Sequence, residues 1–205
     1  MKYTGIVINS NVYKDNDLIV DLLTENEIIT FRSKGIKKQE AKNRSLIFDF
    51  AFIEAEFYNK GEKFTLINGK NLYNYHLLYS SFEGLLFVSF IKEILFKLVV
   101  DEDKILLFND LKSSLIEISN TVETTKILQK LVNLLLKIGV ISGFSPIEYY
   151  KDSGMAEIIS DFYTLNENIQ KYDNNHILNL IKKIAYYLEE TSDIQLNSIS
   201  LLQHL

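Results

Sequence analysis

The spacing of apolar and polar residues divides the chain into two parts with different periods. In the first 75 residues, short apolar runs rich in Ile, Val and Phe are separated by polar turns, such as those at 14–17 and 59–62. Runs of this kind are typical of β-strands, and Gly5 suggests a bend or bulge in the first of them. Five strands are expected, at residues 4–12, 18–23, 28–32, 48–57 and 64–67.

The order of these strands predicts a particular barrel. A basic segment, 35–45, separates the third and fourth strands and is long enough for a turn or two of helix. Three strands, a short helix or loop and two further strands are the element order of the OB-fold, a small Greek-key barrel that binds nucleic acid in many proteins. We therefore expect an OB-fold domain over residues 1–75.

From about Tyr75 onward, apolar residues recur with a period of 3.6, which is typical of helices. Helices are expected at 85–98, from an acidic cap at 101–103 to Ile118, from Thr121 or Glu123 to Gly139 or Gly143, from about 175 to 188, and at 197–205. The expected fold is α+β, with an N-terminal OB-fold β-barrel followed by an all-helical domain over residues 76–205.

The distribution of charge changes what the net charge implies. A net charge of −5 argues at first against a nucleic-acid partner, because phosphate binding depends on concentrated positive charge. Residues 1–80, however, hold 11 basic and 10 acidic side chains, whereas the remainder holds 11 and 17. The acidic surplus belongs to the helical part, and segment 32–44 of the barrel holds six cations and one acid. Six cations are enough to follow several phosphates of a single strand.

The candidate DNA-binding residues combine these cations with an aromatic side chain. Tyr13 lies beside a polar turn and is expected to be exposed for base stacking, whereas most other rings of the barrel are expected in its core. Lys14, Lys60 and Lys63 are weaker candidates. The predicted DNA contacts are Arg32, Lys34, Lys37, Lys38, Lys42, Arg44, Lys14 and Tyr13.

The sequence lacks the residues of the common enzyme classes. There is no cysteine, which excludes thiol catalysis and Cys-ligated metals, and the three histidines are far apart in the sequence. Phosphate-binding and hydrolase motifs are absent, and Asp15, Asp17 and Asp21 fit turn hydrogen bonding better than metal binding. We expect a cytoplasmic, non-enzymatic protein with no catalytic residue, metal, cofactor, small-molecule substrate or membrane segment.

The sequence also resembles the RecO family of DNA-repair recombination mediators. The resemblance is carried by YTGIVINSNVYKDNDLIVDLLTENEIITFRSKGIKK at 3–38, by LLLKIGVISGFSP at 134–146 and by LNSISLLQHL at 196–205. Ser142 stands where the family pattern has Leu. Many family members carry a four-cysteine zinc module just after the second motif, and the matching stretch here, 147–166, has none. The resemblance therefore indicates a short form without that module.

The resemblance implies a nucleoid-associated protein that binds single- and double-stranded DNA and anneals complementary strands. It also implies work with RecR, contact with the single-strand-binding protein, and help in loading recombinase. A second hypothesis stays open from the residues themselves. The helical part, with a net charge of −6, could dock a basic partner. The protein would then be an interaction scaffold of a repair complex with little direct DNA binding.

Overall fold

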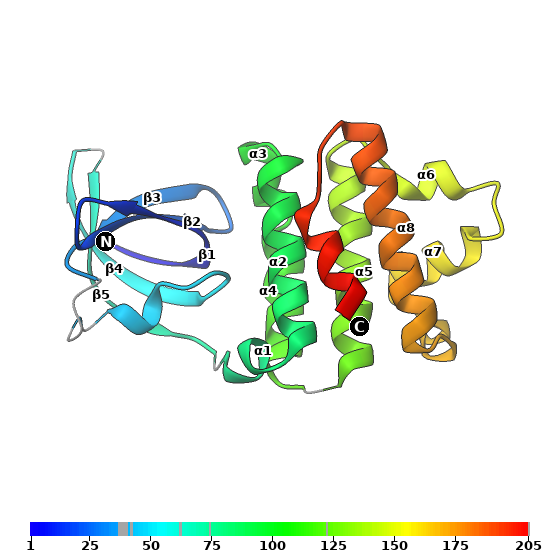
Figure 1. Ribbon diagram of the computed structural model, residues 1–205. Helices are drawn as coiled ribbons and strands as arrows, with labels where there is room; N and C mark the ends of the chain where they lie inside the picture. The colour runs from blue at the N-terminus through cyan, green and yellow to red at the C-terminus, as the bar shows by residue number, and fades with distance from the viewer. Residues whose placement is uncertain (37–40, 42, 62, 74, 122, 205) are drawn as a thin grey trace. The chain divides into compact units, whose positions relative to one another are not determined.

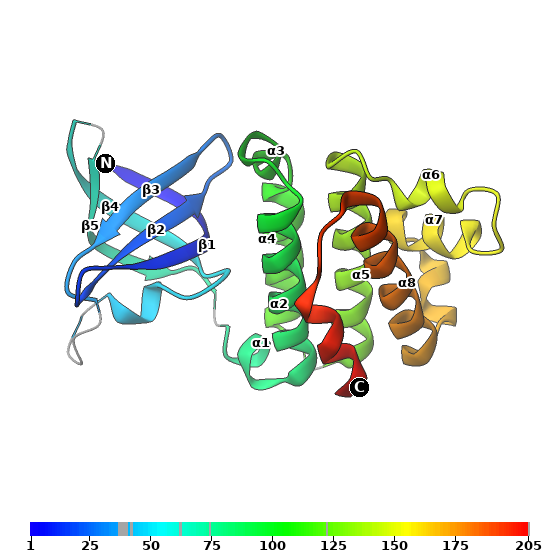
Figure 2. The same cartoon turned by 45° about the horizontal axis from the view of Figure 1, so that its top comes forward.

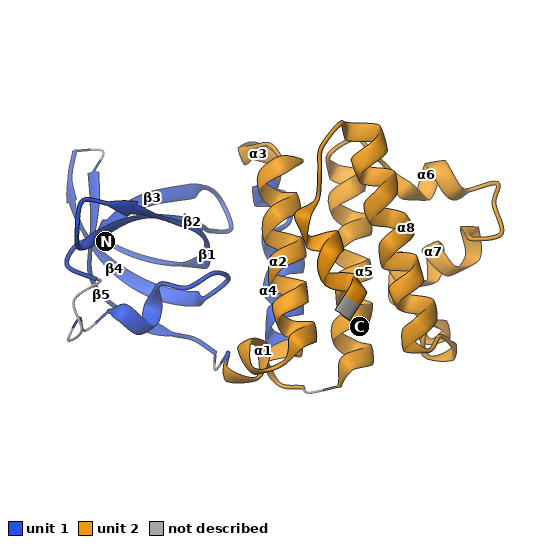
Figure 3. Cartoon of the chain, in the orientation of Figure 1, with its two compact units in different colours: residues 1–75, 104–116 blue, residues 76–103, 117–205 orange. Residues whose placement is uncertain are grey.

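A computed structural model describes residues 1–36, 41, 43–61, 63–73, 75–121 and 123–204 of the chain. The chain forms two compact units (Figure 3). The first contains residues 1–75 together with 104–116, and the second contains 76–103 and 117–205. The predicted residues Lys37, Lys38 and Lys42 lie outside the described part of the chain.

The first unit is built around a closed five-stranded barrel (Figure 1). Its strands are β1 (Lys2–Tyr13), β2 (Asp17–Leu23), β3 (Ile28–Ser33), β4 (Phe52–Lys60) and β5 (Lys63–Asn71). They follow the order β1-β2-β3-β5-β4, with β4 paired back onto β1, and only the β3–β5 pairing is parallel. A one-turn 3₁₀ helix, η1 (Arg44–Leu46), lies between β3 and β4. The expected OB-fold is confirmed.

The barrel interior is filled by alternate residues of each strand. Val7, Leu22, Phe31 and Phe57 are among the side chains removed from solvent there. Gly5 is needed because β1 and β2 approach closely: a Cβ atom at this position would lie 2.6 Å from the carbonyl oxygen of Leu23. Apolar burial on this scale supplies most of the driving force that closes a small barrel.

The fourth strand begins at Phe52, four residues later than the sequence pattern predicts. The preceding residues form a turn in which Phe50 adopts a positive φ of 59° and is fully buried. The Phe50 N–H donates to the Val7 carbonyl at 2.7 Å, and the Val7 N–H donates to the Ala51 carbonyl at 2.8 Å. The first residues of the alternating aromatic and polar pattern, 48–51, therefore form a turn with a buried aromatic side chain, and the strand begins after them.

The second unit is helical, and its three longest helices lie side by side (Figures 1 and 2). These are α2 (Phe82–Lys97), α5 (Thr124–Ile141) and α8 (Asn174–Ser192), with α5 in contact with both of the others. The shorter helices of this unit are α1 (His76–Ser80), α6 (Pro146–Tyr150) and α7 (Ala156–Thr164). Helix α3 (Asp101–Leu106) begins in the second unit and ends in the first, and most of α4 (Phe108–Ser119) belongs to the first. The 3₁₀ helices η2 (Glu167–Lys171) and η3 (Asn197–His204) complete the chain.

Two helix predictions differ from the structure. The segment expected as one helix from 101 to 118 is divided into α3 and α4, with Leu107 between them, and the tail is a 3₁₀ helix. Of the two glycines expected to end α5, Gly143 does so: it follows the last helical residues with a positive φ of 81°. Gly139 lies inside the helix, where a Cβ atom would come within 2.8 Å of the Phe144 carbonyl oxygen. The sequence pattern did not predict α1, α6, α7 or η2, because elements this short carry little periodicity. Among the described residues, no helix is both long and apolar enough to cross a membrane.

Candidate nucleic-acid interface

An open hollow on the barrel collects most of the described candidate residues. Its volume is about 540 Å³. Residues from the ends of β1 and β4, from β2 and β3, and from the start of β5 line it: Tyr13, Ile19, Thr30, Phe31, Arg32, Lys34, Tyr58, Lys60, Lys63, Phe64 and Thr65. The face of strands 2 and 3, between the β1–β2 and β4–β5 loops, is where OB-folds bind oligonucleotides. The hollow occupies that position.

The hollow exists because two tight turns and a short strand pairing meet there. The β1–β2 turn is made with a positive φ of 59° at Lys14, and the β4–β5 turn with 67° at Gly61. The parallel pairing of β3 with β5 is limited to Phe31 opposite Phe64 and Arg32 opposite Thr65. A ladder this short leaves the surface concave at the place where the strands diverge.

Two tyrosines in the hollow present their rings to solvent. Tyr13 at the end of β1 is 41% exposed, and Tyr58 near the end of β4 is 58% exposed. Two other rings that line the hollow are shielded from solvent: Phe31 is 1% exposed, and Phe64 is half-buried. Exposed rings of this kind can stack with unpaired bases, at about 1–3 kcal/mol per base. The exposure expected for Tyr13 is confirmed, and Tyr58 is the more exposed of the two.

The charged lining of the hollow is cationic. Lys34, Lys60 and Lys63 are exposed, and none of the described lining residues is acidic. Lys60 and Lys63 face each other across the β4–β5 hairpin. Like charges directly opposite on neighbouring strands destabilise a hairpin, and a bound anion would relieve that repulsion. In the described part of the chain, no ion pair joins these three lysines to a carboxylate.

Arg32 differs from the lysines because it is already paired. Its Nε–H donates to the Asp17 carboxylate at 2.8 Å, and a second hydrogen bond runs from Nη2 to the same Oδ2. The other oxygen of Asp17 accepts the Gly35 N–H at 2.8 Å. The Gly35 N–H and the Arg32 guanidinium together hold the pKa of Asp17 below its usual value. The guanidinium carbon lies 5.2 Å from the centroid of the Tyr13 ring.

The structure brings some predicted residues together and separates others. Tyr13, Arg32 and Lys34 line the hollow, and the Lys14 ammonium lies 5.5 Å from the Tyr13 ring centroid. Arg44 is exposed in η1 and does not line the hollow. Lys60 and Lys63, weaker candidates from the sequence, line the hollow, and so does Tyr58, which the sequence pattern did not single out. The signal that could have identified them together is the turn at 59–62, which joins the two strands that carry them.

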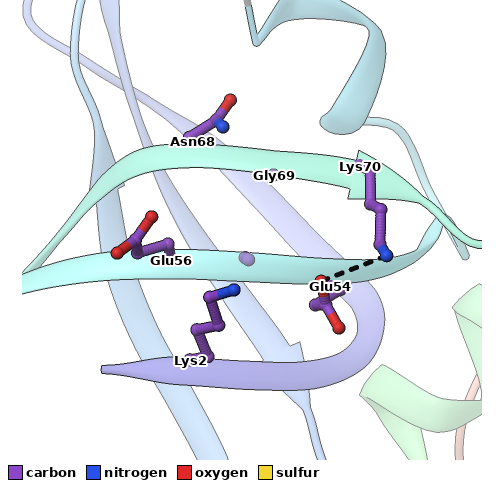
Figure 4. Close-up of a pocket in the computed structure, with 7 residues that line it drawn as sticks. Lys2, Glu54, Glu56, Asn68, Gly69 and Lys70 are labelled. Atoms are coloured by element: carbon purple, nitrogen blue, oxygen red, sulfur yellow. Dashed lines mark ion pairs between the residues drawn. The ribbon is translucent and has the colours of Figure 1, made fainter.

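A second, smaller depression lies on the barrel face formed by β1, β4 and β5 (Figure 4). Its volume is about 110 Å³, and its charged lining is mixed: Lys2, Glu54, Glu56 and Lys70. Lys70 forms an ion pair with Glu54 at 3.3 Å. Two carboxylates here make the surface unfavourable for a phosphate chain. Nowhere among the described residues do three acidic or histidine side chains gather in a way that could hold a metal ion.

A closed barrel with this strand order, and a cationic and aromatic hollow over strands 2 and 3, defines an OB-fold domain of the nucleic-acid-binding class. Residues 1–75 match the family described as recombination protein O N terminal. The resemblance to RecO is thereby confirmed over the barrel: residues 1–75 form a recombination protein O N-terminal domain, and this domain supports a role in DNA repair and recombination. A search of curated proteins finds no match to the chain.

Proposed function

We propose that the barrel binds single-stranded DNA across the hollow, with bases stacked on Tyr13 and Tyr58 and phosphates neutralised by Lys34, Lys60 and Lys63. The observation that carries this proposal is the presence of two exposed tyrosines among exposed cations, with no acidic residue in the described lining. Double-stranded DNA would use only the phosphate contacts, because its bases are already stacked and paired.

The protein then acts as a nucleoid-associated, non-enzymatic recombination mediator. Neutralising the phosphates of a bound strand lowers its repulsion for a second one, so complementary strands anneal more readily on the protein. Assistance to recombinase loading with RecR, on DNA coated by the single-strand-binding protein, extends the same role. This extension is supported by the family of the barrel domain.

Tryptophan fluorescence tests the stacking contacts directly. The chain has no tryptophan, so Tyr58→Trp or Tyr13→Trp introduces a single reporter in the hollow. We expect oligo(dT) to quench this reporter and an abasic oligonucleotide of equal length to quench it much less, because only a base can stack on the ring. A reporter at Tyr149, which is exposed in the helical unit, is the control.

The salt dependence of binding tests the phosphate contacts. Each phosphate neutralised on a single strand contributes about −0.7 to the slope of log K against log salt concentration. Lys60→Gln together with Lys63→Gln should therefore flatten the slope by about 1.4. Lys2→Gln with Lys70→Gln, on the other face of the same barrel, should leave it unchanged. Absence of oligonucleotide binding at low salt would reject the proposal and favour the alternative, a scaffold that contacts partners through its acidic helical part.

A further inference from the structure

Arg32 lies at the centre of a cross-strand array that joins the first three strands. Asp17 stands opposite Tyr13 in the β1–β2 register, and Arg32 stands opposite Ile19 in the β2–β3 register. The carboxylate of Asp17 therefore lies within reach of both neighbouring strands. It accepts the two hydrogen bonds from Arg32 and the one from Gly35, and its side chain is only 13% exposed.

This array restrains both the charge and the geometry of Arg32. A guanidinium with two hydrogen bonds to one carboxylate is oriented by a rigid fork of donors, so its plane is set by Asp17. Its position near the Tyr13 ring is within the range of a cation–π contact. To bind a phosphate instead, Arg32 would leave the poorly exposed carboxylate of Asp17 without its cation, with only the Gly35 N–H as a partner, beside a second anion. Breaking one partner from such a pair is costly.

We propose that Arg32 is a positioning residue: Asp17 locks it in place, it holds the Tyr13 ring as a base-stacking platform, and the lysines alone carry the phosphate contacts of the hollow. This inference rests on the proposed function and refines it. It also gives different roles to Arg32 and Lys34, two cations that are two residues apart and that the sequence alone predicts to have the same role. Asp17 accordingly limits the number of charges that the hollow offers to DNA.

Nuclear magnetic resonance of the arginine side chains tests the lock. The chain has only two arginines, Arg32 and Arg44, so a ¹⁵N spectrum of Nε–H groups contains two signals, and exposed Arg44 is an internal control. We expect the Arg32 signal to exchange slowly with water, and Asp17→Asn to accelerate that exchange. On addition of oligo(dT), the Arg32 signal should persist in slow exchange. Rapid exchange of Arg32 in the free wild-type protein would contradict the lock.

Salt slopes separate positioning from phosphate binding. Asp17→Asn together with Arg32→Gln removes both charges of the pair, so it should leave the slope unchanged and lower the affinity for oligo(dT) about fivefold, while affinity for an abasic oligonucleotide stays the same. Asp17→Asn should steepen the slope by about 0.7, because it releases a cation, and Lys60→Gln should flatten it by the same amount. A slope flattened in the double variant Asp17→Asn, Arg32→Gln as in Lys60→Gln would overturn this inference alone. Failure of the wild-type protein to bind oligonucleotides would overturn the proposed function as well.

Discussion

The carboxylate of Glu93, in the C-terminal half of α2, accepts hydrogen bonds from both the backbone N–H and the hydroxyl group of Ser198, 105 residues further along the chain. It also accepts the Asn197 N–H at 2.8 Å and pairs with the Lys97 ammonium at 2.7 Å. Asn197 and Ser198 are the first residues of η3. The backbone N–H groups at the start of a helix have no partner within that helix. Glu93 therefore fastens the C-terminal segment to the helical unit.

We expect Glu93 to make the stability of the protein depend on pH in the acid range. Burial by itself raises the pKa of this carboxyl, but hydrogen bonds from Lys97, Ser198 and Asn197 outweigh burial and bring the pKa to about 2. A folded-state pKa below the unfolded value of 4.5 means that the stabilisation is complete above pH 4.5 and is lost as the pH falls towards 2.

The variant Glu93→Gln should remove this contribution and lower the free energy of unfolding at pH 7 by roughly 2–3 kcal/mol. The difference in free energy of unfolding between this variant and the wild-type protein should shrink as the pH falls. Denaturant titrations at several pH values would measure it. Glu157→Gln is a suitable control, because Glu157 is 78% exposed in its pair with Lys171. An equal loss of stability in both variants would contradict the role of Glu93.

Asn133 is predicted to stabilise the end of α7. It is 2% exposed on α5, and its side-chain amide donates to the carbonyls of Phe162 and Tyr163, each at 2.9 Å. Carbonyls in the last turn of a helix have no partner within the helix, so Asn133→Ala would leave them unpaired in the interior. We expect a loss of about 2–3 kcal/mol in urea unfolding. Lys126→Ala, on an exposed part of the same helix, should cost under about 0.5 kcal/mol.

Chelators are expected to leave the stability of the protein unchanged. The stretch where the resemblance places a zinc module, 147–166, contains most of α6, all of α7 and no cysteine. Hydrogen bonds hold its far end: the Asp161 carboxylate accepts from the side chains of Asn166, Asn168 and Tyr172. The melting temperature measured with and without EDTA checks this expectation, and a fall in the presence of EDTA would show a structural metal.

Tyr58→Ala should weaken binding to oligo(dT) about fivefold or more, because it removes one stacking ring. The side chain is exposed, so little packing is lost and the melting temperature should change by no more than a degree or two. Fluorescence anisotropy of a labelled oligonucleotide measures the affinity. Tyr149→Ala, which removes an equally exposed ring from the helical unit, should leave binding unaffected. Equal effects of the two substitutions would count against the stacking role of Tyr58.

Local patterns predicted most of the secondary structure and part of the lining of the hollow. Tyr13, Arg32 and Lys34 were identified because each lies in or beside a strand whose turns and charges are visible within a few residues. Phe50 shows the limit of that approach. Its aromatic side chain fits an alternating pattern, yet its backbone turns with a positive φ and pairs with Val7, more than forty residues away. The periodicity of a strand depends on neighbouring residues and does not predict a contact between residues so far apart in the sequence.

The sequence by itself determined the barrel, the helical part and the separation of their charges, since strand and helix periods and local charge are properties of neighbouring residues. Only the tertiary structure decided which cations share a surface. The parallel pairing of β3 with β5 brings Lys60 and Lys63 to the same hollow as Lys34, and the β1–β2–β3 register places Asp17 against Arg32. The charge on a side chain is set by its type, but whether that charge is available to DNA depends on the partners that folding brings to it.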